Sequence, residues 1–217
     1  MIPLRDANPT RRLPMVTLLL IAANGLVFLY ELMMQGQGQL QLFLQQWALT
    51  PARLLGDFSA ESITLLTAMF LHGGWMHLIG NMLYLWIFGD NIEDQLGPVR
   101  FLIFYLVCGL GAAAAQIAID PTSSVPMLGA SGAIAGVLGG YLILFPRARV
   151  LTLVPLILFY RLIEVPAVLV LGFWFVLQLL NGAAALATVQ MQTGGEAFYA
   201  HIGGFVAGLV LIKLFSR

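Results

Sequence analysis

The stretch SGAIAGVLGGYLILF, residues 131–145, carries no charged residue and repeats small residues at four-residue spacing. Two stripes of small residues run along it, one beginning at Ser131 and the other at Gly132. Small residues at this spacing let helices approach one another closely inside a membrane. The stretch therefore predicts a helix that packs tightly against other membrane helices.

The composition of the whole chain points the same way. Of the 217 residues, 60% are hydrophobic and only 9% are charged, whereas soluble domains carry about 25% charged residues. The formal net charge is zero, so no basic surface suggests nucleic acid as a partner. Cys108 is the only cysteine and lies in an apolar run, so we interpret it as a small buried residue. The apolar excess predicts contact with membrane lipid.

Six apolar segments are candidates for membrane-spanning helices, which need about 20 residues each. They cover residues 15–34, 77–89, 100–119, 131–145, 166–180 and 201–215. The fold class predicted is thus an all-α polytopic bundle of six transmembrane helices, forming a single domain over residues 1–217 with a short N-terminal tail, 1–14. The first apolar run is too long for a signal peptide, so we expect it to stay as a helix. The flanks before the second, fourth and sixth segments (63–75, 123–130 and 194–200) are irregular, which predicts a cavity open to one side.

The basic residues predict the topology, because Lys and Arg favour the cytoplasmic side of a membrane. With the N-terminus inside, all of them except Arg53 fall on that side, so both termini are predicted to be cytoplasmic. Residues 35–63 then form a long external first loop. Its mixture of glutamines and large apolar residues suits either short helices lying in the membrane interface or an ordinary folded loop. Residues 147–165 are interpreted as a cytoplasmic or interfacial connection.

The polar residues within these segments are functional candidates, because polar groups are costly in a membrane. The three histidines, His72, His77 and His201, all lie near the predicted outer ends of the second and sixth helices, and Asn81 shares a helix face with His77. Ser131 lies 16 residues before Arg147, His201 lies 16 before the C-terminal residue, and His77 lies 16 before Glu93. At about 1.5 Å per residue, all three lie roughly 24 Å above the inner face.

A shared depth allows a shared site. His201, Gly204 and Gly208 lie on one face of the last helix, and packing of this face against the small residues of the 131–145 helix would join His201 to Ser131. A serine hydroxyl becomes a good nucleophile when an adjacent base takes its proton. The N–H groups at the start of a helix, with His77 and Asn81 beside them, are suitable donors to an oxyanion. Since no acidic residue is placed to orient His201, we expect a dyad rather than a triad.

Two other interpretations compete with catalysis at this level. A glycine-flanked serine is common at helix starts in membrane bundles, and a lone membrane histidine often only bonds a carbonyl. Three histidines are also a possible zinc set. However, His72 and His77 differ by about 140° around a continuous helix, and no carboxylate or cysteine completes such a site. We therefore expect neither a metal nor a cofactor.

The same residues resemble the motifs of the rhomboid family of intramembrane serine proteases. Residues 72–81, HGGWMHLIGN, resemble its histidine–histidine–asparagine motif, and residues 129–132, GASG, its nucleophile motif. Residues 200–208, AHIGGFVAG, resemble its last-helix motif. The stretch 93–97, EDQLG, with Phe101 and Tyr105, is similar to its structural motif after the second helix, and 47–51, WALTP, to a first-loop segment of bacterial members. Four motifs in the right order make the resemblance specific.

The resemblance implies a six-helix core in which Ser131 is the nucleophile and His201 the base. It implies an oxyanion site formed by the Ser131 N–H, His77 and Asn81, with His72 supporting it and Gly129 and Gly132 flanking the nucleophile. The implied substrates are transmembrane proteins, cut near their outer ends and often after a small residue. The fifth helix and the segment that follows, about 182–200, would be the gate and cap.

One departure from the family pattern lies at Ala135, where some relatives carry an aromatic residue that stacks on the catalytic histidine. The alternative from another functional class is a non-proteolytic rhomboid-like protein that binds or escorts transmembrane clients. Such members typically lack the serine or the histidine, and this chain has both. A short chain without extra domains favours a prokaryotic cytoplasmic membrane. The sequence does not name the substrate, the pathway or the oligomeric state.

Overall fold

The computed structural model describes residues 1–156, 159–187 and 197–216. Most of these residues form helices. The long ones are α1 (Met15–Gly36), α6 (Trp75–Leu96), α7 (Pro98–Ile119), α8 (Ser131–Leu144), α9 (Ala167–Ala187) and α10 (Phe198–Phe215). They begin and end within a few residues of the six predicted segments, except that α6 and α9 extend seven residues further at their C-terminal ends. The predicted helical bundle is therefore confirmed.

The number of membrane spans is less regular than the number of long helices. In the described chain, α1, α7, α9 and α10 are each long and apolar enough to cross a membrane. A fifth candidate is the pair formed by residues 58–70 and α6, which is bent by 79° at a short break. At 14 residues, α8 is shorter than a usual span. Six spans thus remain a prediction, whereas a polytopic helical bundle is established.

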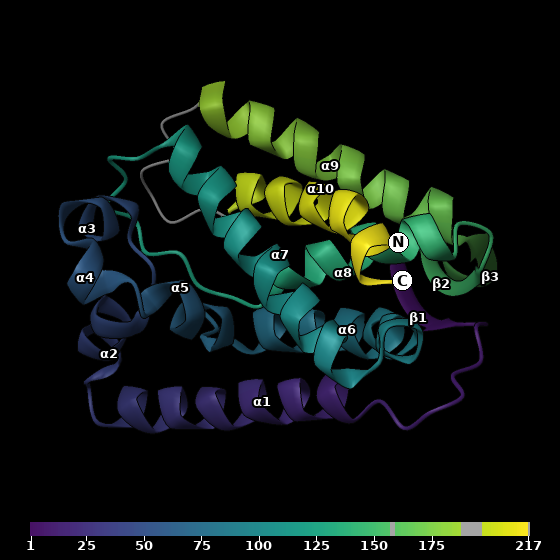
Figure 1. Ribbon diagram of the computed structural model, residues 1–217, viewed down its shortest axis with the longest axis horizontal. Helices are drawn as coiled ribbons and strands as arrows, with labels where there is room; N and C mark the ends of the chain where they lie inside the picture. The colour runs from purple at the N-terminus through teal and green to yellow at the C-terminus, as the bar shows by residue number, and fades with distance from the viewer. Residues whose placement is uncertain (157–158, 188–196, 217) are drawn as a thin grey trace.

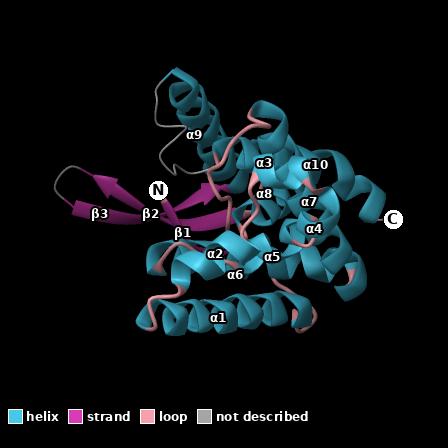
Figure 2. Ribbon diagram, turned by 90° about the vertical axis from the view of Figure 1, so that its left-hand side faces the viewer, coloured by secondary structure: helices cyan, strands magenta, loops and turns pink. Residues whose placement is uncertain are grey.

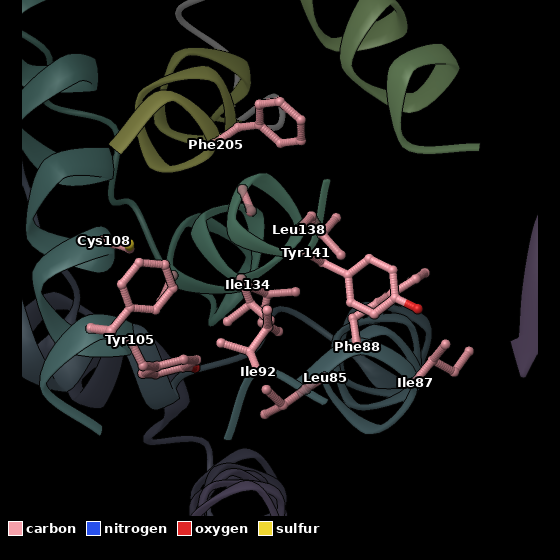
Figure 3. Packing of buried hydrophobic residues seen from close by; sticks show 14 of the residues in the cluster. Leu85, Ile87, Phe88, Ile92, Tyr105, Cys108, Ile134, Leu138, Tyr141 and Phe205 are labelled. Carbon is pink, nitrogen blue, oxygen red and sulfur yellow. The ribbon is translucent and has the colours of Figure 1, made fainter. Parts of the chain in front are cut away.

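The short helix α8 lies at the centre of the bundle. Its residues from Gly132 to Tyr141 are all buried, and α6, α7 and α10 pack around it. Figure 3 shows Ile134, Leu138 and Tyr141 of α8 between side chains of the neighbouring helices, with Phe205 of α10 on one side and Phe88 of α6 on another. A helix that is apolar all round is buried all round, which explains why the 131–145 stretch shows no polar face.

The outer helices have the opposite polarity pattern to those of a soluble protein. Along α1, the buried positions are Thr17, Leu20, Asn24, Phe28 and Glu31, whose spacing follows one helix face. The exposed face of the same helix carries leucines such as Leu19, Leu26 and Leu29. In Figure 1, α1 and α9 lie on opposite sides of the bundle, α1 beside α6 and α9 beside α10. Apolar residues outside and polar residues inside are what a lipid solvent favours.

A carboxylate from α6 holds the start of α1. One oxygen of Glu93 accepts the N–H of Val16 at 2.8 Å, and the other accepts both the N–H and the hydroxyl of Thr17 at 2.7 and 2.8 Å. The first N–H groups of a helix have no partner within it, and a negative charge there is favourable. The motif at 93–97 therefore fastens α1 to α6.

The structure adds a three-stranded antiparallel sheet that the all-helical prediction missed. Strands β1 (Ile2–Asp6), β2 (Arg149–Leu156) and β3 (Phe159–Pro166) pair in that order, and Figure 2 shows them to one side of the helices. The region predicted as a connection, 147–165, contains most of β2 and β3, and the N-terminal tail contains β1. Alternate residues Val150 and Thr152 of β2 are buried, which is the two-residue period of a strand.

The predicted first loop contains ordered helices. Residues 35–63 include α2 (Leu40–Trp47), α3 (Pro51–Gly56) and α4 (Phe58–Glu61), and the chain continues through α5 (Thr64–Thr67) and the 3₁₀ turn η1 (Ala68–Phe70). Short helices are thus confirmed there, and their placement in a membrane interface remains a prediction. The predicted irregular flank before α8, 123–130, is confirmed, whereas the flank before α6, 63–75, is largely helical and is irregular over residues 71–74. Of the third flank, 194–200, residues 194–196 lie outside the described residues, and α10 already begins at Phe198.

Candidate functional site

Ser131 is the first residue of α8, and the segment before it is tied to the first-loop region. The N–H of Gly129 donates to the carbonyl of Ala68 at 2.8 Å, and Met127 exchanges two backbone hydrogen bonds with Leu49. These bonds fix the path of the chain into the helix. Ser131 is therefore presented at the end of a buried helix, where the N–H groups of the first turn are not used by the helix's own ladder.

Close packing of α8 against α10 brings His201 to Ser131. A methyl group added to Gly204 or to Gly208 would fall on the carbonyl oxygen of Gly132 or of Gly136, respectively, so the two backbones are in direct contact. At the end of this contact, His201 Nε2 lies 2.7 Å from Ser131 Oγ. His201 is only 9% exposed. The two residues meet as the stripes of small residues predict.

A third group contacts the histidine, and the sequence reasoning did not find it. Gln178 of α9 is buried, and its Oε1 lies 2.9 Å from His201 Nδ1. Trp174, one turn earlier on α9, has its ring centre 6.0 Å from that of His201. The expected dyad therefore has a neutral hydrogen-bonding partner. A signal was present, because Gln178 is the one strongly polar side chain within the predicted fifth segment, 166–180.

His77 lies on the other side of the nucleophile segment. A methyl group added to Gly129 would lie 2.7 Å from His77 Nε2 and 3.5 Å from Ser131 Oγ. The imidazole and the hydroxyl thus approach the same glycine. The φ angle of Gly129 is +126°, a conformation that residues with a Cβ rarely adopt. Gly129 therefore has both a steric and a conformational reason to be glycine.

His72 and Asn81 form a buried network behind His77. Asn81 Nδ2 lies 3.0 Å from His72 Nε2, while His72 Nδ1 lies 3.3 Å from the carbonyl of Phe70. The rings of His72 and His77 are 5.1 Å apart. The N–H of His72 donates to both carboxylate oxygens of Glu31 at 3.1 and 3.2 Å. Glu31, a buried residue of α1, was also missed by the sequence reasoning, although it is the one acidic residue inside the first predicted segment.

These side chains surround one cavity. Its volume is about 980 Å³, and its lining includes Ser131, His201, His77, Asn81 and Gln178. Gly132 and His72 lie beside it without lining it. Among the described residues, no group of three or more His, Cys, Asp or Glu side chains is arranged to hold a metal ion. The predicted cap, 182–200, lies partly on residues 188–196, outside the described chain.

The fold and the site define a class: a polytopic helical membrane protein in which a serine and a histidine from two tightly packed helices line one cavity. Comparison with known proteins gives the family. The rhomboid domain matches residues 59–217, which is well over half of the chain. The chain belongs to the rhomboid family.

Curated relatives include proteins with mitochondrial and chloroplastic names and a bacterial protein. The mitochondrial rhomboid protein 1 of Saccharomyces cerevisiae is 31% identical over 77% of this chain, and the chloroplastic rhomboid-like protein 11 of Arabidopsis thaliana is 30% identical over 70%. The rhomboid protease GluP of Bacillus subtilis is 32% identical over 66%. The matches span 45%, 51% and 24% of the lengths of these three relatives, respectively.

Proposed function

We propose that this chain is an intramembrane serine endopeptidase that cleaves transmembrane substrates, with Ser131 as nucleophile and His201 as general base. The observation that carries the proposal is the 2.7 Å contact between Ser131 Oγ and His201 Nε2, two side chains that line the cavity. A nucleophile and a base within hydrogen-bond reach form the minimal unit for acyl transfer. Family membership supports the same reaction.

The steps follow from the positions of these groups. His201 Nε2 takes the Ser131 proton while Oγ attacks the carbonyl carbon of the scissile bond. The carbonyl oxygen becomes an oxyanion, which the N–H of Ser131, His77 and Asn81 are proposed to stabilise. His201 then gives the proton to the leaving amine. In the second half of the reaction, a water molecule attacks the acyl-enzyme while His201 again acts as the base. His201 then returns the proton to Ser131 Oγ as the acyl group leaves, and the free serine is restored.

Buried polar groups support the roles of the flanking residues. Asn81 is held by His72, and His72 is held at its backbone by Glu31. Donors that are already fixed need no reorganisation when charge develops, which is how such sites accelerate a reaction. Gly129 and Gly132 are proposed to allow the close packing around the nucleophile, since a methyl on Gly129 would lie 2.7 Å from His77 Nε2 and one on Gly132 would lie 2.6 Å from the Ala112 side chain.

The finer points of location belong to the same proposal. The basic residues favour both termini in the cytoplasm, so the site would act near the outer face of the membrane. Relatives occur in Bacillus subtilis, and others carry mitochondrial and chloroplastic names. The family match thus supports an integral membrane protein without selecting a prokaryotic cytoplasmic membrane. The proposal includes no cofactor, and EDTA is expected not to inhibit.

The test is cleavage of a reporter transmembrane substrate by the purified protein, together with labelling by a small serine-directed fluorophosphonate. Ser131→Ala and His201→Ala should each abolish both signals while the melting temperature stays close to that of the wild type. Normal cleavage by Ser131→Ala would refute the assignment. A folded wild type that binds transmembrane clients without cutting them or taking up the label would instead be the non-proteolytic escort.

A further inference from the structure

The second ring nitrogen of His201 has a partner on a third helix. Nε2 faces Ser131 Oγ at 2.7 Å, and Nδ1 faces Gln178 Oε1 at 2.9 Å. A neutral imidazole carries its proton on only one nitrogen, and the hydrogen bond at the other nitrogen decides which one. For Nε2 to accept the serine proton, Nδ1 must carry a hydrogen, and that hydrogen requires an acceptor.

We infer that Gln178 is a positioning residue, whose amide oxygen holds His201 in the tautomer that leaves Nε2 bare toward Ser131. The inference rests on the proposed function and adds a third member to the site. Gln178 is 8% exposed and lines the cavity, and its Oε1 lies 2.9 Å from His201 Nδ1. A hydrogen on His201 Nδ1 also determines which way the Gln178 amide points, because only the amide oxygen can accept a hydrogen bond from Nδ1–H.

A neutral acceptor suits this position better than a carboxylate would. Burying a carboxylate costs several kcal/mol unless it is fully paired. Both ring nitrogens of His201 are already engaged and the ring is almost wholly buried. An amide oxygen can fix the tautomer, and it stabilises the transient imidazolium through its dipole, without placing a permanent charge there.

The neighbouring tryptophan restrains the same ring from the side. Trp174 and Gln178 are four residues apart and therefore lie on one face of α9. Trp174 lies 6.0 Å from the rings of both His201 and Phe205. The nucleophile thus comes from α8, the base from α10 and the groups that orient the base from α9. A displacement of α9 that broke the 2.9 Å contact between Gln178 and His201 would leave the nucleophile in place and release the base.

The experiment compares three substitutions on α9. Gln178→Met keeps the length of the side chain and removes the acceptor. Gln178→Glu restores an oxygen that accepts the Nδ1–H. Val176→Met places the same new side chain on a half-exposed position of α9 away from the cavity. For each protein we would measure the labelling rate with the small fluorophosphonate, kcat and KM for the reporter substrate, and the melting temperature.

Gln178→Met should lower the labelling rate and kcat by about 10- to 100-fold, the effect of losing one buried hydrogen bond, with KM changed by less than about 2-fold. Gln178→Glu should recover most of the labelling rate, and Val176→Met should label like the wild type. Gln178→Asn shortens the side chain by one methylene. It should lower the labelling rate and kcat as much as Gln178→Met does. If Gln178→Met is unstable, Gln178→Asn provides the test of the inference.

Wild-type labelling by a folded Gln178→Met would overturn the inference. So would equal slowing in Gln178→Met and Val176→Met, because the effect would then belong to α9 as a whole. A failure of the proposed function looks different: the wild type itself would not label, and Ser131→Ala would match it. A labelled wild type with an unlabelled Ser131→Ala supports the protease whatever Gln178 does.

Discussion

At the scale of single residues, Gly129 is a position where the site leaves no room for a side chain. It stands between the His77 ring and the Ser131 hydroxyl, and its φ of +126° is one that other residues rarely adopt. A side chain there meets two penalties. The backbone strain costs on the order of 1–3 kcal/mol, and the added methyl displaces the imidazole or the nucleophile.

Gly129→Ala should therefore lower cleavage by about 100-fold or more, since a misplacement of roughly 1 Å can cost that much in rate. Cleavage of the reporter and the melting temperature would be measured together. Gly25→Ala is the matched control, because a methyl at Gly25 of α1 meets nothing within 4 Å. Full activity of Gly129→Ala would mean that His77 has no part in the site.

The residues that the sequence predicted and those that it missed differ in a physical way. Ser131 and His201 could be found because glycine patterns predict which helix faces meet. Gln178 and Glu31 were missed because their partners, a ring nitrogen and a backbone N–H, are brought near only by the packing of α9 and α1. A polar residue in an apolar run is visible in the sequence, but its partner is not.

At the scale of elements, the contact between α8 and α10 brings Ser131 and His201 together. At two successive turns, a glycine of α10 lies against a backbone carbonyl of α8. A clash at this contact cannot be relieved by rotating a side chain, because the opposing atom is a backbone oxygen. Even a single added methyl must push the helices apart.

Gly204→Ala and Gly208→Ala should each lower the melting temperature and the activity together. Overpacking of a tight interface costs typically about 1–3 kcal/mol, and any separation of the helices lengthens the contact between Ser131 and His201. Gly172→Ala on α9 is the control, since its methyl would meet nothing within 4 Å. Wild-type stability and cleavage in both α10 variants would show that the two helices are further apart than the structure has them.

The sheet was the largest element that sequence reasoning missed. Residues 149–166 mix charged, β-branched and aromatic residues. In β2, further apolar residues interrupt the alternation of apolar and polar residues that would indicate a strand. Pairing with β1, which lies in an N-terminal tail far away in the sequence, completes the ladder. The sheet is joined to the bundle through Asp6, whose carboxylate accepts the Tyr141 hydroxyl at 2.6 Å.

This contact should make stability depend on pH. Burial raises the pKa of Asp6 above its ordinary value of 3.8, although the hydrogen bond from Tyr141 partly opposes the shift. Above pH 3.8, the folded chain therefore binds more protons at Asp6 than the unfolded chain, and stability falls as the pH rises through the folded-state pKa.

Asp6→Asn cannot ionise, yet its amide oxygen can still accept the Tyr141 hydroxyl. The melting temperature of the variant should depend less on pH than that of the wild type. As the pH rises from about 4 toward 7, the melting temperature of the variant should increase relative to that of the wild type. Melting in detergent micelles across that range measures the difference. Parallel curves for the two proteins would contradict the role given to Asp6.

At the scale of the whole molecule, polar groups gather inside while apolar residues cover the outside. Helix α1 shows this directly, with Asn24 and Glu31 buried and leucines exposed. A membrane tolerates such an interior only where protein or a wet cavity satisfies the polar groups. Glu31 accepts the backbone N–H of His72, and Ser131 and His201 line a cavity of about 980 Å³. Under the proposed function, a peptide bond must reach this cavity to be cut.

For the proposed reaction, this architecture limits which substrates can be cleaved. A stable transmembrane helix hides its carbonyls in its own hydrogen bonds, so a segment must unwind before Ser131 can attack it. Glycine and proline lower that cost, because they disfavour a helix interior by about 1 and 3 kcal/mol relative to alanine. Residues 129–132, GASG, are all small, and an added methyl would clash with His77 of α6 at Gly129 and with Ala112 of α7 at Gly132. Little space is left there for a large side chain next to the scissile bond.

We accordingly predict cleavage at a small residue in the outer third of a substrate helix, promoted by a nearby helix breaker. The depth follows from His77 and Glu93 lying 16 residues apart on the continuous helix α6, which places the site about 24 Å from the inner end at roughly 1.5 Å per residue. The test moves one cleavable segment stepwise through a host transmembrane helix and maps the products by mass spectrometry. Each of these substrates is paired with a control in which the helix breaker is replaced by alanine. Cutting near the cytoplasmic end would contradict the depth, and equal cutting of both members of each pair would contradict the need for unwinding.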